Sequence, residues 1–174
     1  MKLINIVCSG DFHAQIDLDL INSLNNPLFT YVRKKYHGGY FHISHGKATI
    51  YASGKYIIYG LKNIEDINPS FNELCEFLSP HIDVSEVTPP KIQNIVGMER
   101  FPQEIDLNKI VNSMQFEQCE YEPEQFPGLI IHLKDCTALI FKSGKVILPG
   151  GKSIEGLERC WNHLKGKILN VLSG

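Results

Sequence analysis

The sequence contains no long apolar run, and this absence argues against a helical membrane protein. No stretch approaches the roughly 18 consecutive apolar residues that a membrane-spanning helix needs. The N-terminal residues MKLINIVCSG show no signal-peptide pattern. Hydrophobic residues make up 43% of the 174, which is enough apolar surface for a packed core. We therefore predict a soluble intracellular globular protein with no membrane partner.

Motifs of metal sites, disulfide frameworks and common enzymes are also missing. The five cysteines are an odd number without a CxxC pair, which argues against a disulfide framework and a zinc site. The seven histidines show no HExxH spacing, and the chain lacks a GxSxG elbow, a P-loop and a DxDxG loop. We therefore expect no catalytic residue, no metal and no cofactor, and we expect the cysteines to be small buried or half-buried hydrophobic residues.

The net charge of −2 conceals a segregation of charge along the chain. Residues 1–62 contain seven Lys/Arg and three Asp/Glu, whereas residues 63–87 contain six Asp/Glu and no Lys or Arg. A local basic surface binds phosphates even on an acidic protein, because the nearby charges dominate at the contact. The net charge therefore does not exclude nucleic acid as a partner.

An internal repeat is present along the whole chain. Four segments recur in the same order at an offset of 89 or 90 residues: LINIV at 3–7 and IQNIV at 92–96, IDL at 16–18 and 105–107, SGK at 53–55 and 143–145, and Gly60 and Lys62 as Gly150 and Lys152. This order predicts two copies of one unit, residues 1–88 and 91–174. Pro89 and Pro90 between them predict a stiff connector that is not helical.

Each copy shows the same order of expected strands. An apolar, β-favouring run opens each copy, Leu3–Ser9 in the first and Lys91–Gly97 in the second. Further short β-like runs are separated by turns, at 39–44, 48–52 and 55–59 in the first copy and at 128–133, 138–141 and 145–148 in the second. The Ser-Gly-Lys segments have the composition of hairpin turns between adjacent strands.

Two helices are expected in each copy. Asp17 and Asp106 stand where helix N-caps would be, just before apolar residues. An amphipathic stripe closes each copy, over residues 64–78 and 154–171. Pro69 predicts a break near Asn68, where an asparagine cap would restart the helix. The fold class is therefore α+β, with two pseudo-symmetric repeats forming one curved antiparallel sheet and helices on one face.

The other face of such a sheet is uncovered and is not composed of alternating charges. By the two-residue period of a strand, Asn5 and Val7 share a face, as do Asn94 and Val96. The alternate residues of 55–59, a lysine, an isoleucine and a tyrosine, also share a face. A surface of apolar, amide and lysine side chains with two-fold pseudo-symmetry suits a pseudo-symmetric ligand.

Three segments of the second copy closely resemble the second repeat of the TATA-box-binding protein core: IQNIV at 92–96, YEPEQFPGLI at 121–130 and ALIFKSGK at 138–145. The first copy resembles the family's first repeat through INIV at 4–7 and SGK at 53–55. The resemblance implies a saddle with helices on its convex face, whose concave sheet binds the minor groove of double-stranded A/T-rich DNA and bends it.

The resemblance also implies roles for individual residues. Aromatic wedges match Phe126 and Phe141, and the same positions in the first repeat are Tyr36 and Tyr51. The other DNA-contacting positions, which read the groove or touch the backbone, are Asn5, Val7, Ser53, Lys55, Ile57, Asn94, Val96, Ser143, Lys145 and Ile147. Glu122, Glu124 and Gln125 match the loop that contacts a TFIIB-type initiation factor in the family.

We therefore expect a general transcription initiation factor that binds and bends promoter DNA and recruits a TFIIB-type factor and, indirectly, RNA polymerase. Its expected location is the cytoplasm or nucleoid, or the nucleus in a eukaryotic host. Some family positions differ here: a threonine is replaced by Tyr59 and Pro149, and phosphate-binding arginines by Lys35, His42 and His132. The alternative is a divergent protein of the same fold that binds non-TATA DNA or a protein partner without reading promoters.

Overall fold

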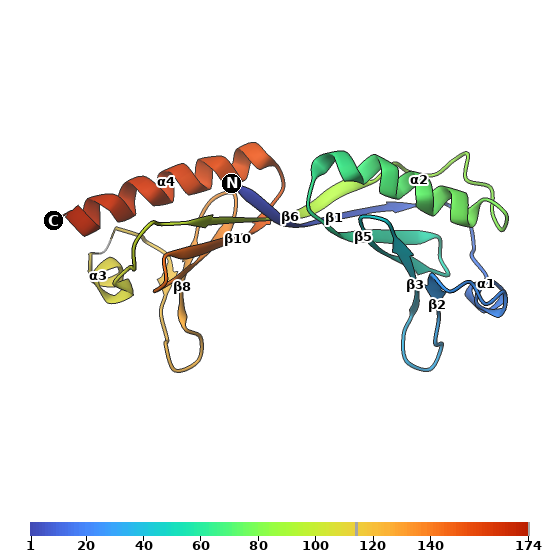
Figure 1. Cartoon of the computed structure of the whole chain (residues 1–174), viewed down its shortest axis with the longest axis horizontal. Helices are drawn as coiled ribbons and strands as arrows, with labels where there is room; N and C mark the ends of the chain where they lie inside the picture. Colours follow the sequence, from blue (N-terminus) through green and yellow to red (C-terminus); the bar gives the residue numbers. More distant parts are fainter. Residues whose placement is uncertain (114, 174) are drawn as a thin grey trace. The chain divides into compact units, whose positions relative to one another are not determined.

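The computed structural model describes residues 1–113 and 115–173, which form two compact units (Figure 1). One unit comprises Asn5–Gln93, and the other comprises Met1–Ile4 with the described residues from Asn94 onward. The first half of the chain has these elements: β1 (Lys2–Asp11), α1 (Leu18–Ser23), β2 (Phe29–Thr30), β3 (Gly38–Ile43), β4 (Gly46–Tyr51), β5 (Lys55–Leu61), the 3-10 helix η1 (Ile64–Asp66) and α2 (Ile67–Leu78). The second half has β6 (Lys91–Arg100), α3 (Leu107–Asn112), β7 (Cys119–Glu120), β8 (Gly128–His132), β9 (Thr137–Phe141), β10 (Lys145–Gly151) and α4 (Ile154–Ser173).

Both units have the same strand arrangement. In the unit of residues 5–93 the order is β2-β3-β4-β5-β1, with antiparallel pairing throughout. The other unit has the order β7-β8-β9-β10-β6, again antiparallel. The α+β class is therefore confirmed, as are the expected strands, with ends shifted by up to three residues. The two-residue strands β2 and β7 were not expected, because two residues carry no periodic pattern.

The core of each unit lies between the sheet and its long helix. On β1, Ile6 and Cys8 are fully buried while Asn5 and Val7 are half-exposed, as the two-residue period predicts. Leu74 of α2 is fully buried over this face. All five cysteines are free and are buried or half-buried, which confirms the expectation for them. Burial raises the pKa of the Cys8 thiol to about 11, because the thiolate would lose its hydration.

The N-caps of the short helices are confirmed. The Asp17 carboxylate accepts a hydrogen bond from Leu20 N at 2.9 Å, and the Asp106 carboxylate accepts one from Lys109 N at 3.2 Å. Such a cap satisfies a backbone donor that has no partner within the helix. The amphipathic stripe of α4 is confirmed too, since Leu157 and Leu164 are fully buried.

The predicted break near Asn68 is present but lies between Asp66 and Ile67, and the prediction of an asparagine cap is wrong. A 3-10 turn ends at Asp66, and α2 begins at Ile67 and continues through Pro69. Pro69 therefore occupies the first turn of α2, where backbone N–H groups have no partner within the helix in any case. A proline in the first turn removes no helical hydrogen bond, so the chain does not need to break there.

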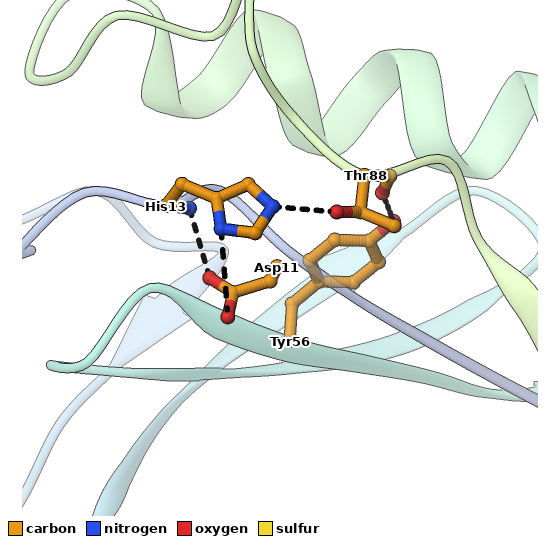
Figure 2. A network of polar contacts seen from close by, with 4 residues as sticks. All are labelled: Asp11, His13, Tyr56 and Thr88. Carbon is orange, nitrogen blue, oxygen red and sulfur yellow. Dashed lines mark hydrogen bonds and ion pairs between the residues drawn. The ribbon is translucent and has the colours of Figure 1, made fainter.

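A polar network holds Thr88, just before the two prolines, against β1 and β5 of its own unit (Figure 2). The Tyr56 hydroxyl donates to the Thr88 carbonyl oxygen at 2.8 Å, and Thr88 N donates to the Asp11 carbonyl oxygen at 2.7 Å. His13 Nε2 lies 2.7 Å from Thr88 Oγ1, and His13 N donates to Asp11 Oδ1 at 2.8 Å. Burial raises the pKa of Tyr56, so its hydroxyl stays protonated and keeps donating.

Candidate nucleic-acid interface

Each unit has an open face, which we define as the half-exposed side of its sheet opposite α2 or α4 (Figure 1). In the unit of residues 94–173, Ile147 is paired with Met98 on one side and Leu139 on the other. In the unit of residues 5–93, Ile57 is paired with Ser9 and Thr49. These pairs lie across the centre of each open face, so its middle is apolar or weakly polar.

The two predicted groove-reading asparagines have the same geometry in both units. Asn5 Oδ1 accepts a hydrogen bond from Gly60 N at 2.9 Å, and Asn94 Oδ1 accepts one from Gly150 N at 3.0 Å. A backbone N–H can only donate, so each contact identifies the oxygen of the amide and leaves the NH₂ group on the other side. Each asparagine is half-exposed and so presents a hydrogen-bond donor toward the open face.

The glycines that hold these amides have a backbone conformation that suits glycine. Gly60 has φ +80° and Gly150 has φ +87°, in the left-handed region that other residues rarely adopt. The pairing register shifts beside each of them, and this shift turns the N–H toward the asparagine. The sequence showed both glycines only as part of the repeat. Their recurrence beside the strand ends was the signal that could have revealed their role.

A hydrogen-bond donor beside apolar side chains has a defined chemical preference. Adenine N3 and thymine O2 are acceptors in the minor groove, whereas guanine adds a donor amino group. An amide NH₂ therefore pairs with an A·T edge and meets a like donor at a G·C pair. The half-exposed Val7 and Val96 lie two residues along from the asparagines and offer contact without hydrogen bonds.

The predicted wedge residues Phe126 and Phe141 form a pair. Their ring centroids are 5.7 Å apart with an interplanar angle of 68°, an edge-to-face contact, and both side chains are half-exposed. Gly128 lies beneath them, and a Cβ there would come within 2.6 Å of Phe126 and 3.2 Å of Phe141. The absence of a side chain at residue 128 thus leaves room for both rings.

The tyrosines at the same positions of the other unit have different neighbours. Tyr36 is 45% exposed and contacts Tyr40 edge-on, with ring centroids 5.2 Å apart. The residue equivalent to Tyr40 in the other unit is Ile130, which has no ring. Tyr51 lies beside Gly38, whose Cβ would be 3.3 Å from the tyrosine ring. Sequence comparison between the repeats missed Tyr40, because the ring occurs in one copy only.

The Ser-Gly-Lys segments form the hairpin turns β4–β5 and β9–β10, as predicted. Ser53, Ser143 and Lys55 are exposed, and Lys145 is half-exposed. Lys145 is paired in register with Arg100, whose guanidinium donates to the Ser143 carbonyl oxygen at 3.3 Å. In the other unit the residue opposite Lys55 is the acid Asp11. Arg100, which the sequence analysis missed, therefore makes the turn at 143–145 the more strongly cationic.

The predicted partner residues Glu122, Glu124 and Gln125 are exposed on the loop between β7 and β8. Gln125 N and Phe126 N both donate to the Glu122 carbonyl oxygen, at 2.9 and 3.0 Å. This turn presents the two carboxylates to solvent. Within the described part of the chain, no helix is long and apolar enough to cross a membrane, and no group of three or more His, Cys, Asp or Glu could hold a metal ion.

Comparisons with known proteins agree with this geometry. The family described as "Transcription factor TFIID (or TATA-binding protein, TBP)" matches residues 1–81 and 89–171. TATA-box-binding protein B of Halobacterium salinarum is 32% identical over 96% of this chain and 92% of its own. The TATA-box-binding protein of Archaeoglobus fulgidus is 35% identical over 97% of this chain and 94% of its own. The solved structure of Methanococcus jannaschii TBP matches with a TM-score of 0.82 and 31% identity, covering 97% of this chain and 98% of that one.

Proposed function

Because this chain belongs to the TATA-binding protein family, we infer that it is a general transcription initiation factor that binds TATA promoter DNA. Its relatives are named as DNA-binding proteins and not as enzymes. We also propose that its two repeats are residues 1–88 and 91–174.

The asparagine pair is the single observation that best supports minor-groove reading. We propose that the NH₂ groups of Asn5 and Asn94 donate to adenine N3 or thymine O2, since their oxygens are already engaged by Gly60 and Gly150. The residues that contact the groove without hydrogen bonds are Val7, Ile57, Val96 and Ile147. An amide locked in this way cannot rotate to accept from the guanine amino group, so it discriminates against G·C pairs.

The aromatic residues are proposed as wedges that kink the duplex. Rings inserted between base pairs unstack a step and open the minor groove, and TATA-binding proteins are themselves a standard example of this mechanism. Phe126 and Phe141 would act at one end of the site, and Tyr36 and Tyr51 at the other. A tyrosine hydroxyl must remain hydrated or find a partner in the groove, which distinguishes the two ends chemically.

Contacts to the DNA backbone are proposed for the hairpin turns. Ser53 and Lys55 in one unit, and Ser143 and Lys145 in the other, place hydroxyl and ammonium groups at the rim of the open faces. Such groups hold the protein in register on the phosphates without reading the sequence. The additional guanidinium of Arg100 favours stronger phosphate binding by the unit of residues 94–173.

The acidic loop is proposed as the contact for a TFIIB-type factor and, through it, RNA polymerase. Glu122 and Glu124 are exposed carboxylates on an ordered turn, with Gln125 beside them. Charge reversal of Glu122 and Glu124 to arginine tests this contact. The matched control is Glu76→Lys on α2, because Glu76 is also an exposed glutamate. Glu73 is unsuitable as a control, since its carboxylate accepts a hydrogen bond from Ser44 N at 2.9 Å.

Binding to three duplexes that separate the minor groove from the major groove tests the proposed function. The first carries a TATA sequence, the second replaces its A·T pairs with inosine–cytosine pairs, and the third has guanine–cytosine pairs at those positions. Inosine lacks the guanine amino group, so minor-groove reading predicts similar affinity for the first two and weaker binding to the third. Equal affinity for all three, at each of several salt concentrations, would instead support the alternative of a protein of this fold that does not read promoters.

A further inference from the structure

Exposed large apolar side chains gather in one segment of the chain. Among the described residues these side chains are Met1, Leu20, Leu24, Leu28, Val32, Tyr36 and Leu169. Five of the seven lie between residues 20 and 36, in and after α1. Leu20, Leu24 and Leu28 are each at least half-exposed, at 54%, 58% and 50%. Single exposed leucines are ordinary, but a concentration in one segment indicates an interaction site.

Hydrogen bonds hold this segment together as one surface region. Asn22 Oδ1 on α1 accepts from Tyr31 N at 3.0 Å, and the Arg33 guanidinium lies 3.4 Å from the Asp19 carboxylate. These contacts hold α1 against the start of the loop between β2 and β3, and Figure 1 shows α1 beside β2. The leucines of α1 and its C-terminal extension therefore lie on the same part of the unit as the loop.

The other unit shows that the fold does not require these apolar residues. Equivalent positions follow from equivalent hydrogen bonds. Leu24 N and Ser113 N each donate to the carbonyl oxygen three residues earlier in the chain. In the same way, the Leu28 carbonyl oxygen accepts from His42 N, and the Gln118 carbonyl oxygen accepts from His132 N. The leucines thus correspond to a serine and a glutamine. At an offset of 89 residues, Leu20 corresponds to a lysine as well.

The charge of the adjoining loop is also reversed between the units. Tyr36 N donates to the Val32 carbonyl oxygen at 3.0 Å, just as Phe126 N donates to that of Glu122. The two loops therefore have the same turn, yet one carries Arg33, Lys34 and Lys35 where the other carries Pro123, Glu124 and Gln125. All three basic residues are exposed.

We propose that this surface is a docking site for an amphipathic segment of a partner protein that carries both acidic and apolar side chains. We call it the α1 surface, and it consists of Leu20, Leu24, Leu28, Val32, Arg33, Lys34 and Lys35. The apolar side chains supply area to bury, and Lys34 and Lys35 supply charge complementarity to carboxylates, whereas Arg33 already lies beside the Asp19 carboxylate. A second copy docked symmetrically would bring like charges together, and a nucleic acid would leave the leucines without apolar contact.

The proposal goes beyond DNA binding and has its own test. A displayed library of random amphipathic helical peptides is selected on the full chain, and enriched peptides are labelled and titrated by fluorescence anisotropy. Two variants graft residues from the other repeat: Leu24→Ser with Leu28→Gln, and Lys34→Glu with Lys35→Gln. The expected result is enrichment of acidic peptides with an apolar face, each losing at least tenfold in affinity for both variants.

Controls separate this result from a failure of folding or of DNA binding. The leucine variant should keep its cooperative thermal transition and its affinity for the TATA duplex, because the side chains it removes are exposed and lie outside the open face. Leu20→Lys provides an independent apolar change if that variant does not fold. The proposal is overturned if no peptide binds more tightly than its scrambled version. It is also overturned if the enriched peptides bind the leucine variants as well as the unmodified chain, in which case the basic loop serves phosphates alone.

Discussion

The edge-to-face pair Phe126–Phe141 offers the sharpest test of how this protein engages DNA. The changes are Phe126→Ala, Phe141→Ala, both together, and Gly128→Ala. The first three remove rings that are half-exposed on the open face. The fourth keeps both rings but adds a Cβ that would lie 2.6 Å from the Phe126 ring, so the ring must move.

The expected magnitudes follow from these contacts. Stacking of a base on an aromatic side chain contributes on the order of 1–3 kcal/mol, so each single alanine variant should bind DNA about 5- to 150-fold more weakly. The contact between the rings holds each in place and is worth about 0.5–1.5 kcal/mol. The loss in the double variant should therefore fall short of the sum of the two single losses by about that amount. Gly128→Ala should weaken binding although both rings remain.

The assay is fluorescence anisotropy with a labelled TATA duplex at fixed salt, accompanied by thermal unfolding of each variant. The rings face outward, so each alanine variant should keep a cooperative transition. Loss of that transition in the double variant would show that the rings belong to the core, and the wedge proposal would fail. Strict additivity of the binding losses would refute the argument that the two rings act as a pair.

Three further predictions concern the amides, the acidic loop and a buried thiol. Asn94→Ala should reduce the preference for the TATA duplex over its G·C counterpart, and equal losses on both duplexes in the anisotropy assay would contradict base reading. Lys145→Ala should instead weaken binding to both duplexes and lower the slope of log affinity against log salt concentration by about one. Glu122→Arg with Glu124→Arg should abolish the ternary complex with a purified TFIIB-type factor on DNA in a gel shift while leaving binary DNA binding intact, and a preserved ternary complex would place the partner elsewhere. Cys8 is fully buried and burial raises the pKa of its thiol to about 11, so its alkylation by iodoacetamide at pH 8 should be much slower in the native protein than in the unfolded chain; a fast reaction of native Cys8 in mass spectrometry would be a contradiction.

Much of the fold was predictable because its signals are local. The alternation of buried and half-exposed residues along β1 and the carboxylate caps at Asp17 and Asp106 depend on residues close together in the sequence. The helix boundary at Ile67 was predicted incorrectly, because a proline is tolerated anywhere in the first turn and its position does not identify the cap.

The details of the candidate site depended on contacts between distant residues. Asn5 and Gly60 are 55 positions apart, and no local pattern indicates that the backbone of one orients the amide of the other. The contact of Tyr36 with Tyr40 likewise required the loop to be placed against β3. Resemblance to a family identified candidate positions, but it did not supply the direction in which each polar group points.

The sequence by itself determined that this protein consists of two copies of one α+β unit. Hydrophobic periodicity, turn residues and helix caps each depend on residues close together in the sequence, and they recur in both copies. Only the tertiary structure decided how the copies differ in chemistry. It aligned exposed leucines and a basic loop in one unit with polar residues and an acidic loop in the other, on the same backbone turn. The physical reason is that exposed side chains contribute little to folding, so their identity varies without changing the fold. The chemistry of the surface that they form depends on which side chains folding places beside them.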